Sequence, residues 1–164
     1  MITETSVTLF TEQVRKRGKA LEQRVIDYLK SSNIPYNYNT HNGIDFIING
    51  DIHMDCCAQG VSGSIGDKVP HKVYKYARKY NLKDIYILHP YSPITQNVAM
   101  HLMDLEKWLD CKIHIIGWDD FTYLMQGGKF FVRKPYNSVK NSAQISSGIT
   151  NPITHNKFFD FKTN

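Results

Sequence analysis

The stretch "GIDFIINGDIHMDCCAQG", residues 43–60, reads as two short apolar strands that fold back on each other. A two-residue turn at Asn49 and Gly50 would set Ile48 opposite Asp51, Phe46 opposite His53 and Ile44 opposite Asp55, an apolar residue opposite a polar one in each of these pairs. A loop of three residues, 49–51, gives one wholly apolar face, with Ile48 opposite Ile52, Phe46 opposite Met54 and Ile44 opposite Cys56. The buried face fixes the register of a hairpin, so the sequence predicts the three-residue loop.

The same register brings two acidic side chains together. Asp45 would lie opposite Asp55, with Cβ atoms about 5 Å apart, on a face that also carries Cys57 and Gln59. Neighbouring carboxylates repel each other unless something neutralises them, and a divalent metal such as Mg²⁺ takes carboxylate oxygens as ligands. The hairpin therefore predicts a metal site at Asp45 and Asp55. The alternative interpretation is that both acids lie at a solvated strand end, or that one of them is protonated.

Helical and strand patterns alternate along the rest of the chain. Apolar residues recur at helical spacing from about Thr8 to Ser32, and a second helix begins near Pro70. The later predicted elements are a strand over 84–90, a helix over 94–110, a strand over 112–118 and a short helix over 119–125. Strands separated by helices predict an α/β fold, a mixed sheet flanked by helices in which the hairpin is the antiparallel part.

Length and charge divide the chain into two parts. The 164 residues have ordinary apolar content, which is enough for one sizeable core. Basic and acidic residues balance over 1–126, the predicted core domain, so the whole net charge of +5 comes from 127–164. This C-terminal extension is rich in Asn, Ser and Lys, and it interleaves cations such as Arg133 and Lys134 with aromatic residues. It fits a solvated, partly disordered segment and, equally, an arm that orders on a phosphate backbone.

Several classes of protein are disfavoured by the sequence. No apolar run approaches the roughly 20 residues that a membrane-spanning helix needs, and the N-terminus lacks a basic region followed by an apolar one. We therefore expect a protein that is not secreted, does not enter the membrane and works in the cytoplasm or inside a host cell. Three cysteines, two of them adjacent, make a poor disulfide framework and lack the second ligand pair of a structural zinc site.

Four segments, taken in order, resemble a known family of enzymes. They are "GKALEQRVIDYL", "GIDFII", "HMDCCAQG" and "SGSIGDKVPHKVYKY", and over roughly residues 12–90 their order and spacing resemble the PD-(D/E)xK nuclease superfamily. The resemblance implies the restriction-endonuclease-like fold, with an α β β α β α β core. It matches Asp45 and Asp55 to the metal-binding acids of that family. It also matches Glu22 to a helical acid that holds a second metal or a water, and Gln59 to a glutamine that positions the phosphate or the water.

The sequence departs from the family pattern at Cys57, which stands where the family has lysine. That lysine is thought to orient or activate the attacking water and to offset phosphate charge, and a thiol is no cation. Three explanations are open: a displaced lysine such as Lys68 or Lys72 replaces it, the lysine is dispensable, or the site is inactive. A nucleophilic role for Cys57 itself is disfavoured, because the neighbouring Asp55 would raise the pKa of its thiol.

Basic side chains provide candidate nucleic-acid contacts in three places. They are Arg15 and Lys16 in the first helix, Lys68, Lys72, Lys75 and Lys79 in or near the second, and Arg133 and Lys134 in the extension. The resemblance implies a DNA endonuclease that uses Mg²⁺, or alternatively Mn²⁺, to hydrolyse phosphodiester bonds. We expect a site-specific enzyme of restriction, homing or phage and mobile-element type.

Cleavage of duplex DNA takes two such sites, so we expect a homodimer or a larger assembly. Two other classes of function stay open. One is a DNA-binding protein that keeps the nuclease fold without catalysis, and the other is a structural or interaction protein in which the paired acids are coincidental.

Overall fold

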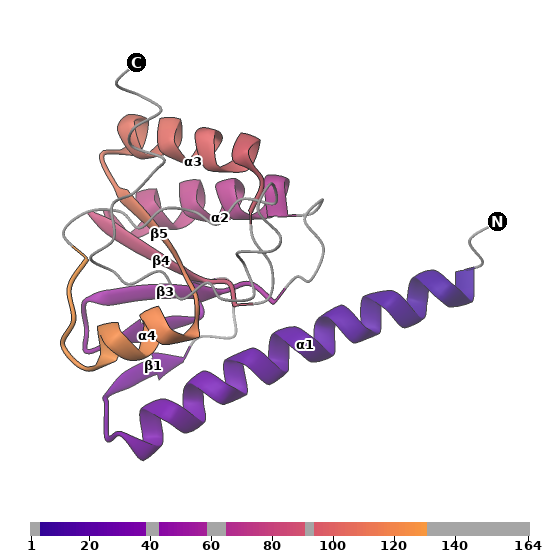
Figure 1. Cartoon of the computed structure of the whole chain (residues 1–164), viewed down its shortest axis with the longest axis horizontal. Coiled ribbons are helices and arrows are strands. Elements are labelled where there is room, and N and C mark those ends of the chain that lie inside the picture. The colour runs from indigo at the N-terminus through magenta and orange to yellow at the C-terminus, as the bar shows by residue number, and fades with distance from the viewer. Residues whose placement is uncertain (1–3, 39–42, 59–64, 91–93, 131–164) are drawn as a thin grey trace.

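The computed structural model describes residues 4–38, 43–58, 65–90 and 94–130 of the 164-residue chain. A five-stranded sheet forms the centre, and helices cover both of its faces (Figure 1). In chain order the elements are α1 (Glu4–Ser31), β1 (Tyr36–Tyr38), β2 (Phe46–Ile48), β3 (Ile52–Cys56), α2 (Ile65–Tyr80), β4 (Asp84–Leu88), α3 (Gln96–Leu109), β5 (Lys112–Ile116) and α4 (Trp118–Met125). The α/β class predicted from the sequence is confirmed.

The strands lie side by side in chain order, from β1 at one edge to β5 at the other. β1, β2 and β3 pair antiparallel, whereas β3, β4 and β5 pair parallel and are connected through α2 and α3. The predicted mixed sheet, with the hairpin as its antiparallel part, is thus confirmed. Strand β1 lies outside the predicted elements, and the alternation of tyrosine and asparagine in "YNY" is the period-two signal for it.

The hairpin of β2 and β3 has the predicted register and the predicted three-residue loop. Facing pairs in the ladder are Phe46 with Met54, Ile47 with His53 and Ile48 with Ile52. Asn49 and Gly50 in the loop both adopt left-handed φ angles, 53° and 81°. Glycine and asparagine tolerate this conformation better than other residues, so the loop sequence suits the tight reversal of the chain.

The predicted pairing of Ile44 with Cys56 is wrong. Ladder pairing ends at Phe46, and the Ile44 side chain is fully buried on the opposite face of the sheet, in the same cluster as Val73. The cause is local, because Asp45 Oδ2 accepts a hydrogen bond from the backbone N–H of Cys56 at 2.8 Å. A side chain thus takes the place of the next ladder hydrogen bond, and Ile44 packs under α2.

Two apolar clusters hold the sheet between its helices. Helices α2 and α3 cover one face, and α1 and α4 cover the other (Figure 1). Fully buried members of the first cluster include Val73, Ile85, Ile87 and Leu102, and those of the second include Leu21, Val25, Phe46 and Phe121. Burying each such side chain contributes about 1.5–3 kcal/mol before the loss of conformational entropy. Phe130 also packs in the second cluster, and residues 131–164 of the predicted extension lie outside the described residues.

Helix α1 packs on the sheet with its C-terminal half. Leu21, Val25 and Leu29 are fully buried there. Over 12–20, by contrast, the described side chains are exposed, apart from the half-buried Gly18. The N-terminal half of the helix therefore leaves the body as a projecting arm (Figure 1). In the described part of the chain, no helix is both long and apolar enough to cross a membrane.

Candidate functional site

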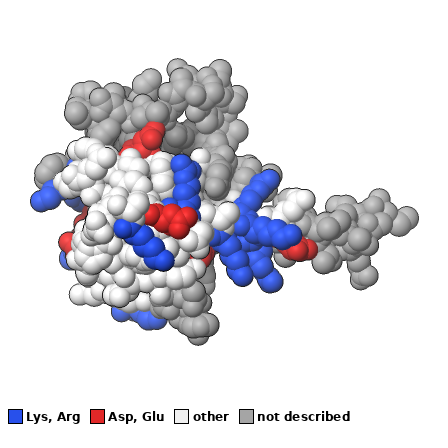
Figure 2. All heavy atoms as spheres, turned by 90° about the horizontal axis from the view of Figure 1, so that it is seen from below, with Lys and Arg blue, Asp and Glu red and all other residues white. Residues whose placement is uncertain are grey.

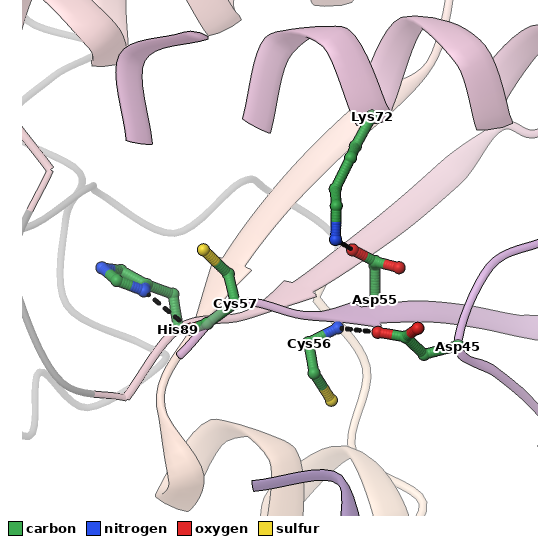
Figure 3. A network of polar contacts seen from close by, with 6 residues as sticks. All are labelled: Asp45, Asp55, Cys56, Cys57, Lys72 and His89. Carbon is green, nitrogen blue, oxygen red and sulfur yellow. Dashed lines mark hydrogen bonds and ion pairs between the residues drawn. The ribbon is translucent and has the colours of Figure 1, made fainter. Parts of the chain in front are cut away.

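Asp55 lies near the end of β3 and points from the sheet toward α2, where it is fully buried (Figure 3). Its Oδ2 forms an ion pair with the Nζ of Lys72, which reaches down from α2. Asp55 Oδ1 is buried as well, and it has no hydrogen-bond partner among the described residues. A buried carboxylate oxygen without a partner is costly, so the site favours a further cation or donor at this point.

Lys72 is held in place by the packing of α2. It directly precedes Val73, which is fully buried, so Lys72 lies at the border of the buried face of α2, and its ammonium group meets the Asp55 carboxylate. Burial lowers the pKa of Lys72, but the Asp55 carboxylate outweighs this effect and the net pKa lies above the ordinary lysine value. Lys72 is therefore charged at neutral pH. Its side chain is 36 % exposed, so a ligand can reach it.

Asp45 lies just before β2, at the level of the sheet and beside Asp55 (Figure 3). It is half-buried, and its Oδ2 accepts the hydrogen bond from the Cys56 backbone. Burial and the nearby Asp55 carboxylate raise the pKa of Asp45 to about 7, although the Cys56 amide and Lys72 act in the opposite direction. The structure thus brings together the two acids singled out in the sequence, without the direct cross-strand pairing that the register predicted.

Glu22 comes from α1, on the face of the sheet opposite to α2, and lies near Tyr38 and Cys56. The hydroxyl of Tyr38, on edge strand β1, donates a hydrogen bond to Glu22 Oε2. This bond and burial raise the pKa of Tyr38, and the charges of Glu22 and Asp45 add to the effect. Tyr38 is therefore part of the candidate site. Tyr38 was not predicted as a site residue, because strand β1 was not predicted either. The alternation of tyrosine and asparagine in this strand is the sequence signal for both.

The two adjacent cysteines point to opposite faces of the sheet (Figure 3). Cys56 lies on the α1 side, where burial and the charges of Asp45, Asp55 and Glu22 raise the pKa of its thiol. Cys57 lies on the α2 side, on the same face as Asp55, as the alternation of β3 predicts. It is only 8 % exposed and packs in the apolar cluster that includes Val73. Among the described residues, Cys56, Cys57 and Cys111 form no disulfide.

The end of β4 contributes a further side chain next to Cys57. His89 is buried, and its Nδ1 lies 3.0 Å from the carbonyl oxygen of Cys57, within hydrogen-bond distance. The backbone N–H of Cys57 donates to Leu88 O at 2.8 Å, so the ends of β3 and β4 are tied together here. The carboxyl ends of parallel strands are a common place for binding sites. His89 lies inside the predicted strand over 84–90, and in the structure it directly follows β4.

The remaining predicted residues are distributed over the surface or fall outside the described chain. Gln59, Arg133 and Lys134 lie outside the described residues. Lys68, Lys75 and Lys79 are exposed, and the ammonium groups of Lys75 and Lys79 lie 5.5 Å and 5.3 Å from the ring centroids of Tyr76 and Tyr80. Arg15 and Lys16 are exposed on the projecting half of α1. Lys72 thus differs from its neighbours, because its ammonium group turns into the acid pair.

Asp45 and Asp55 offer carboxylate oxygens as potential ligands for a divalent cation. In the described part of the chain, no group of three or more His, Cys, Asp and Glu side chains is arranged to hold a metal ion. A bound cation would relieve two features: the buried Oδ1 of Asp55, which has no hydrogen-bond partner among the described residues, and the raised pKa of Asp45. Carboxylate oxygens are ligands that Mg²⁺ and Mn²⁺ prefer, and Mg²⁺ usually keeps several waters beside one or two carboxylates.

Comparison with known proteins identified no relative: no protein-family model, curated protein or solved structure matches this chain.

Proposed function

We propose that this chain is a metal-dependent DNA endonuclease with a restriction-endonuclease-like arrangement of its sheet and helices. Asp45 and Asp55 would hold a Mg²⁺ or Mn²⁺ ion, and Lys72 would take the role that the family gives to the lysine replaced by Cys57. The observation that carries the proposal is the ion pair between Lys72 and Asp55, which sets a cation beside the acids on the face where Cys57 also points.

Lys72 has the properties that the missing lysine would need. A lysine two residues after Asp55 would point to the same face of the sheet, because side chains alternate along a strand. Lys72 brings its ammonium group to that face from the opposite direction, from α2 above the sheet. It is charged at neutral pH and partly exposed, so it can offset the charge that develops on a phosphate during cleavage.

The other site residues would bind the metal ion, the water and the phosphate, or release a proton. Once bound, the metal ion would lower the pKa of its water and act as a Lewis acid toward the scissile phosphate. Asp45, with a pKa of about 7, would release its proton as the cation binds. Glu22, held by the hydroxyl of Tyr38, would accept a hydrogen bond from a water at the edge of the site or help to hold a second ion. Gln59 would contact the phosphate or the attacking water.

The substrate proposed is double-stranded DNA, cut at specific sites in the manner of restriction, homing or phage and mobile-element enzymes. One acid pair per chain can cut one strand at a time. Cleavage of both strands then takes two copies of the chain, so a homodimer or a larger assembly is part of the proposal.

A second candidate function is DNA binding without catalysis. The observation that favours it is the burial of Cys57 in the apolar cluster beside a closed Asp55–Lys72 ion pair. A buried ion pair can be structural, and a site that lost its lysine could keep the fold and the basic surface. This candidate predicts salt-dependent DNA binding with no cleavage under any metal condition.

Nicking of supercoiled plasmid DNA separates the two candidates. The proposal expects relaxed and linear products with Mg²⁺ or Mn²⁺, none with EDTA, and loss of cleavage in Asp55→Asn and Asp45→Ala. Asp104→Asn is the matched control, because Asp104 is an exposed acid on α3. A protein that binds the plasmid but never nicks it, or that nicks it equally well in both site variants, would refute the endonuclease proposal.

A further inference from the structure

The projecting half of α1 carries a concentration of positive charge. Four basic residues lie within five positions, namely Arg15, Lys16, Arg17 and Lys19, and all four side chains are exposed. Figure 2 shows Lys and Arg atoms gathered on the part of α1 that leaves the body. Two acids with described side chains lie close to them: Glu12, which pairs with Lys16 at 3.0 Å, and Glu22, three residues beyond Lys19. Arg15 and Lys19 have no acidic partner among the described residues.

Helical spacing aligns two of these cations with the candidate site. Arg15, Lys19 and Glu22 follow one another at intervals of four and three residues, so they form a single row along one flank of α1. Glu22 is the member of the row that meets Tyr38 near Asp45. The rise of an α-helix places Lys19 about 4.5 Å and Arg15 about 10 Å beyond Glu22 along the axis. The row therefore leads outward from the acids along the arm.

Arg17 lies on the opposite side of the same arm. It follows Arg15 by two residues, which turns it by about 200° around the helix axis. Its side chain is exposed as well. Two nearby residues of equal charge thus differ in whether they belong to the row that ends at the site.

We infer that Arg15 and Lys19 bind the phosphate backbone of the DNA strand that enters the site, so that the free half of α1 guides the substrate. This inference rests on the proposed function, because the row is defined by its end at the acids. Charge complementarity favours DNA as the occupant of this flank. A second copy of the chain would bring equal positive charge against it, and the two arms would repel each other.

The test compares two double variants that remove the same charge. Arg15→Gln with Lys19→Gln alters the row, and Arg17→Gln with Lys107→Gln alters exposed cations outside it, one on the opposite side of the arm and one on α3. Binding of the full chain to a fluorescein-labelled DNA duplex is measured by anisotropy in EDTA, over salt concentrations from about 50 to 200 mM. We expect the row variant to bind on the order of tenfold more weakly and to lower the salt slope by about two. The control variant should stay close to the unaltered chain.

Each contrary outcome overturns the inference. Equal binding by the row variant and the unaltered chain would remove Arg15 and Lys19 from the interface. Equal weakening in both double variants would mean that only net charge matters. Self-association of the free chain that the row variant abolishes, measured by sedimentation velocity, would assign the arm to a second copy instead.

The same experiment separates failure of the inference from failure of the proposed function. Binding in EDTA does not depend on cleavage. If the row variant binds DNA more weakly but the chain never nicks plasmid, the inference still holds for the second candidate function, DNA binding without catalysis. A chain that nicks plasmid with an unaffected row variant would leave the endonuclease standing and refute the guiding arm.

Discussion

The ammonium group of Lys72 and the carboxylate of Asp55 form an ion pair across the space between α2 and β3. The two residues are 17 positions apart in the sequence, and a parallel crossover brings them together. Asp55 is fully buried, so the pair is the only compensation that its Oδ2 has in the described structure. Removing the cation should therefore affect both folding and any chemistry at the acids.

Lys72→Met tests this dependence. The variant keeps most of the packing of the aliphatic stem and leaves a buried carboxylate without its cation, so we expect a loss of stability of about 2 kcal/mol, below the value for a fully buried pair because Lys72 is partly exposed. Metal-dependent nicking should fall at least about 100-fold, the usual effect of deleting one electrostatic contact to a reacting phosphate or oxyanion. Urea denaturation and initial nicking rates measure the two effects.

Lys75→Met is the matched control for that experiment. Lys75 is an exposed lysine on the same helix, one turn further along, and its ammonium group lies over the Tyr76 ring instead of an acid. It should change stability by less than about 0.5 kcal/mol and leave nicking within about threefold. A similar loss of nicking in both variants would indicate general electrostatic attraction of DNA and no special role for Lys72.

Cys57→Lys asks whether the family lysine can be restored at its own position. The structure predicts no gain, because Cys57 is packed in the apolar cluster and Lys72 already brings a cation to this face. A second ammonium group there would be partly desolvated beside a like charge, and we expect destabilisation of roughly 3 kcal/mol. The rate of nicking should not rise.

The double variant Cys57→Lys with Lys72→Met gives the sharper comparison. If the two positions serve one role, the lysine at position 57 should recover at least about tenfold of the nicking lost in Lys72→Met, since the like-charge conflict is gone. Cys57→Ala, which keeps a small apolar side chain, is the control and should nick normally. A large gain from Cys57→Lys alone would contradict the assignment of Lys72.

The sequence predicts the hairpin well and the site only in part, and the difference has a physical cause. Register depends on which side chains are buried, and the pairs Phe46–Met54 and Ile48–Ile52 were predicted from apolar matching alone. The same reasoning fails at Ile44, because the backbone N–H of Cys56 donates its hydrogen bond to Asp45 Oδ2 and the ladder is interrupted there. Hydrophobic alternation carries no information about such a bond.

The orientation of the Lys72 side chain also cannot be predicted from the local sequence pattern. By helical spacing, one stripe of α2 consists of Val69, Val73, Tyr76 and Tyr80; the first three are buried and Tyr80 is half-buried. Lys72 belongs by spacing to a second, exposed row with Lys75, yet its ammonium group turns inward because Asp55 is buried beneath α2. A long flexible side chain at the border of an apolar stripe can point either way, and only the position of its partner decides.

Asp45 should make stability depend on pH. Its pKa is about 7 in the folded chain, against about 4 for an ordinary aspartate, so the folded state binds more protons between these values. The contribution of Asp45 to the free energy of unfolding is therefore fully present below about pH 4. It is lost as the pH rises to about 7, and the loss is at most about 4 kcal/mol. Urea unfolding at several pH values should show Asp45→Asn gaining stability relative to the unaltered chain as pH rises. Asp104→Asn should show no such trend.

Added Mg²⁺ should reverse that trend, because a cation binds the ionised form of Asp45 and stabilises the folded state. For an ion with a dissociation constant near 1 mM, a concentration of about 10 mM adds about 1.4 kcal/mol, or roughly 3–5 °C in Tm for a chain of this size. The increase should be larger at about pH 8 than at about pH 5.5, since the proton on Asp45 competes with the ion below its pKa. Thermal unfolding with and without Mg²⁺, at constant ionic strength, measures it. Asp45→Asn with Asp55→Asn should abolish the increase at both pH values, and an increase that survives in this double variant would place the ion elsewhere on the chain.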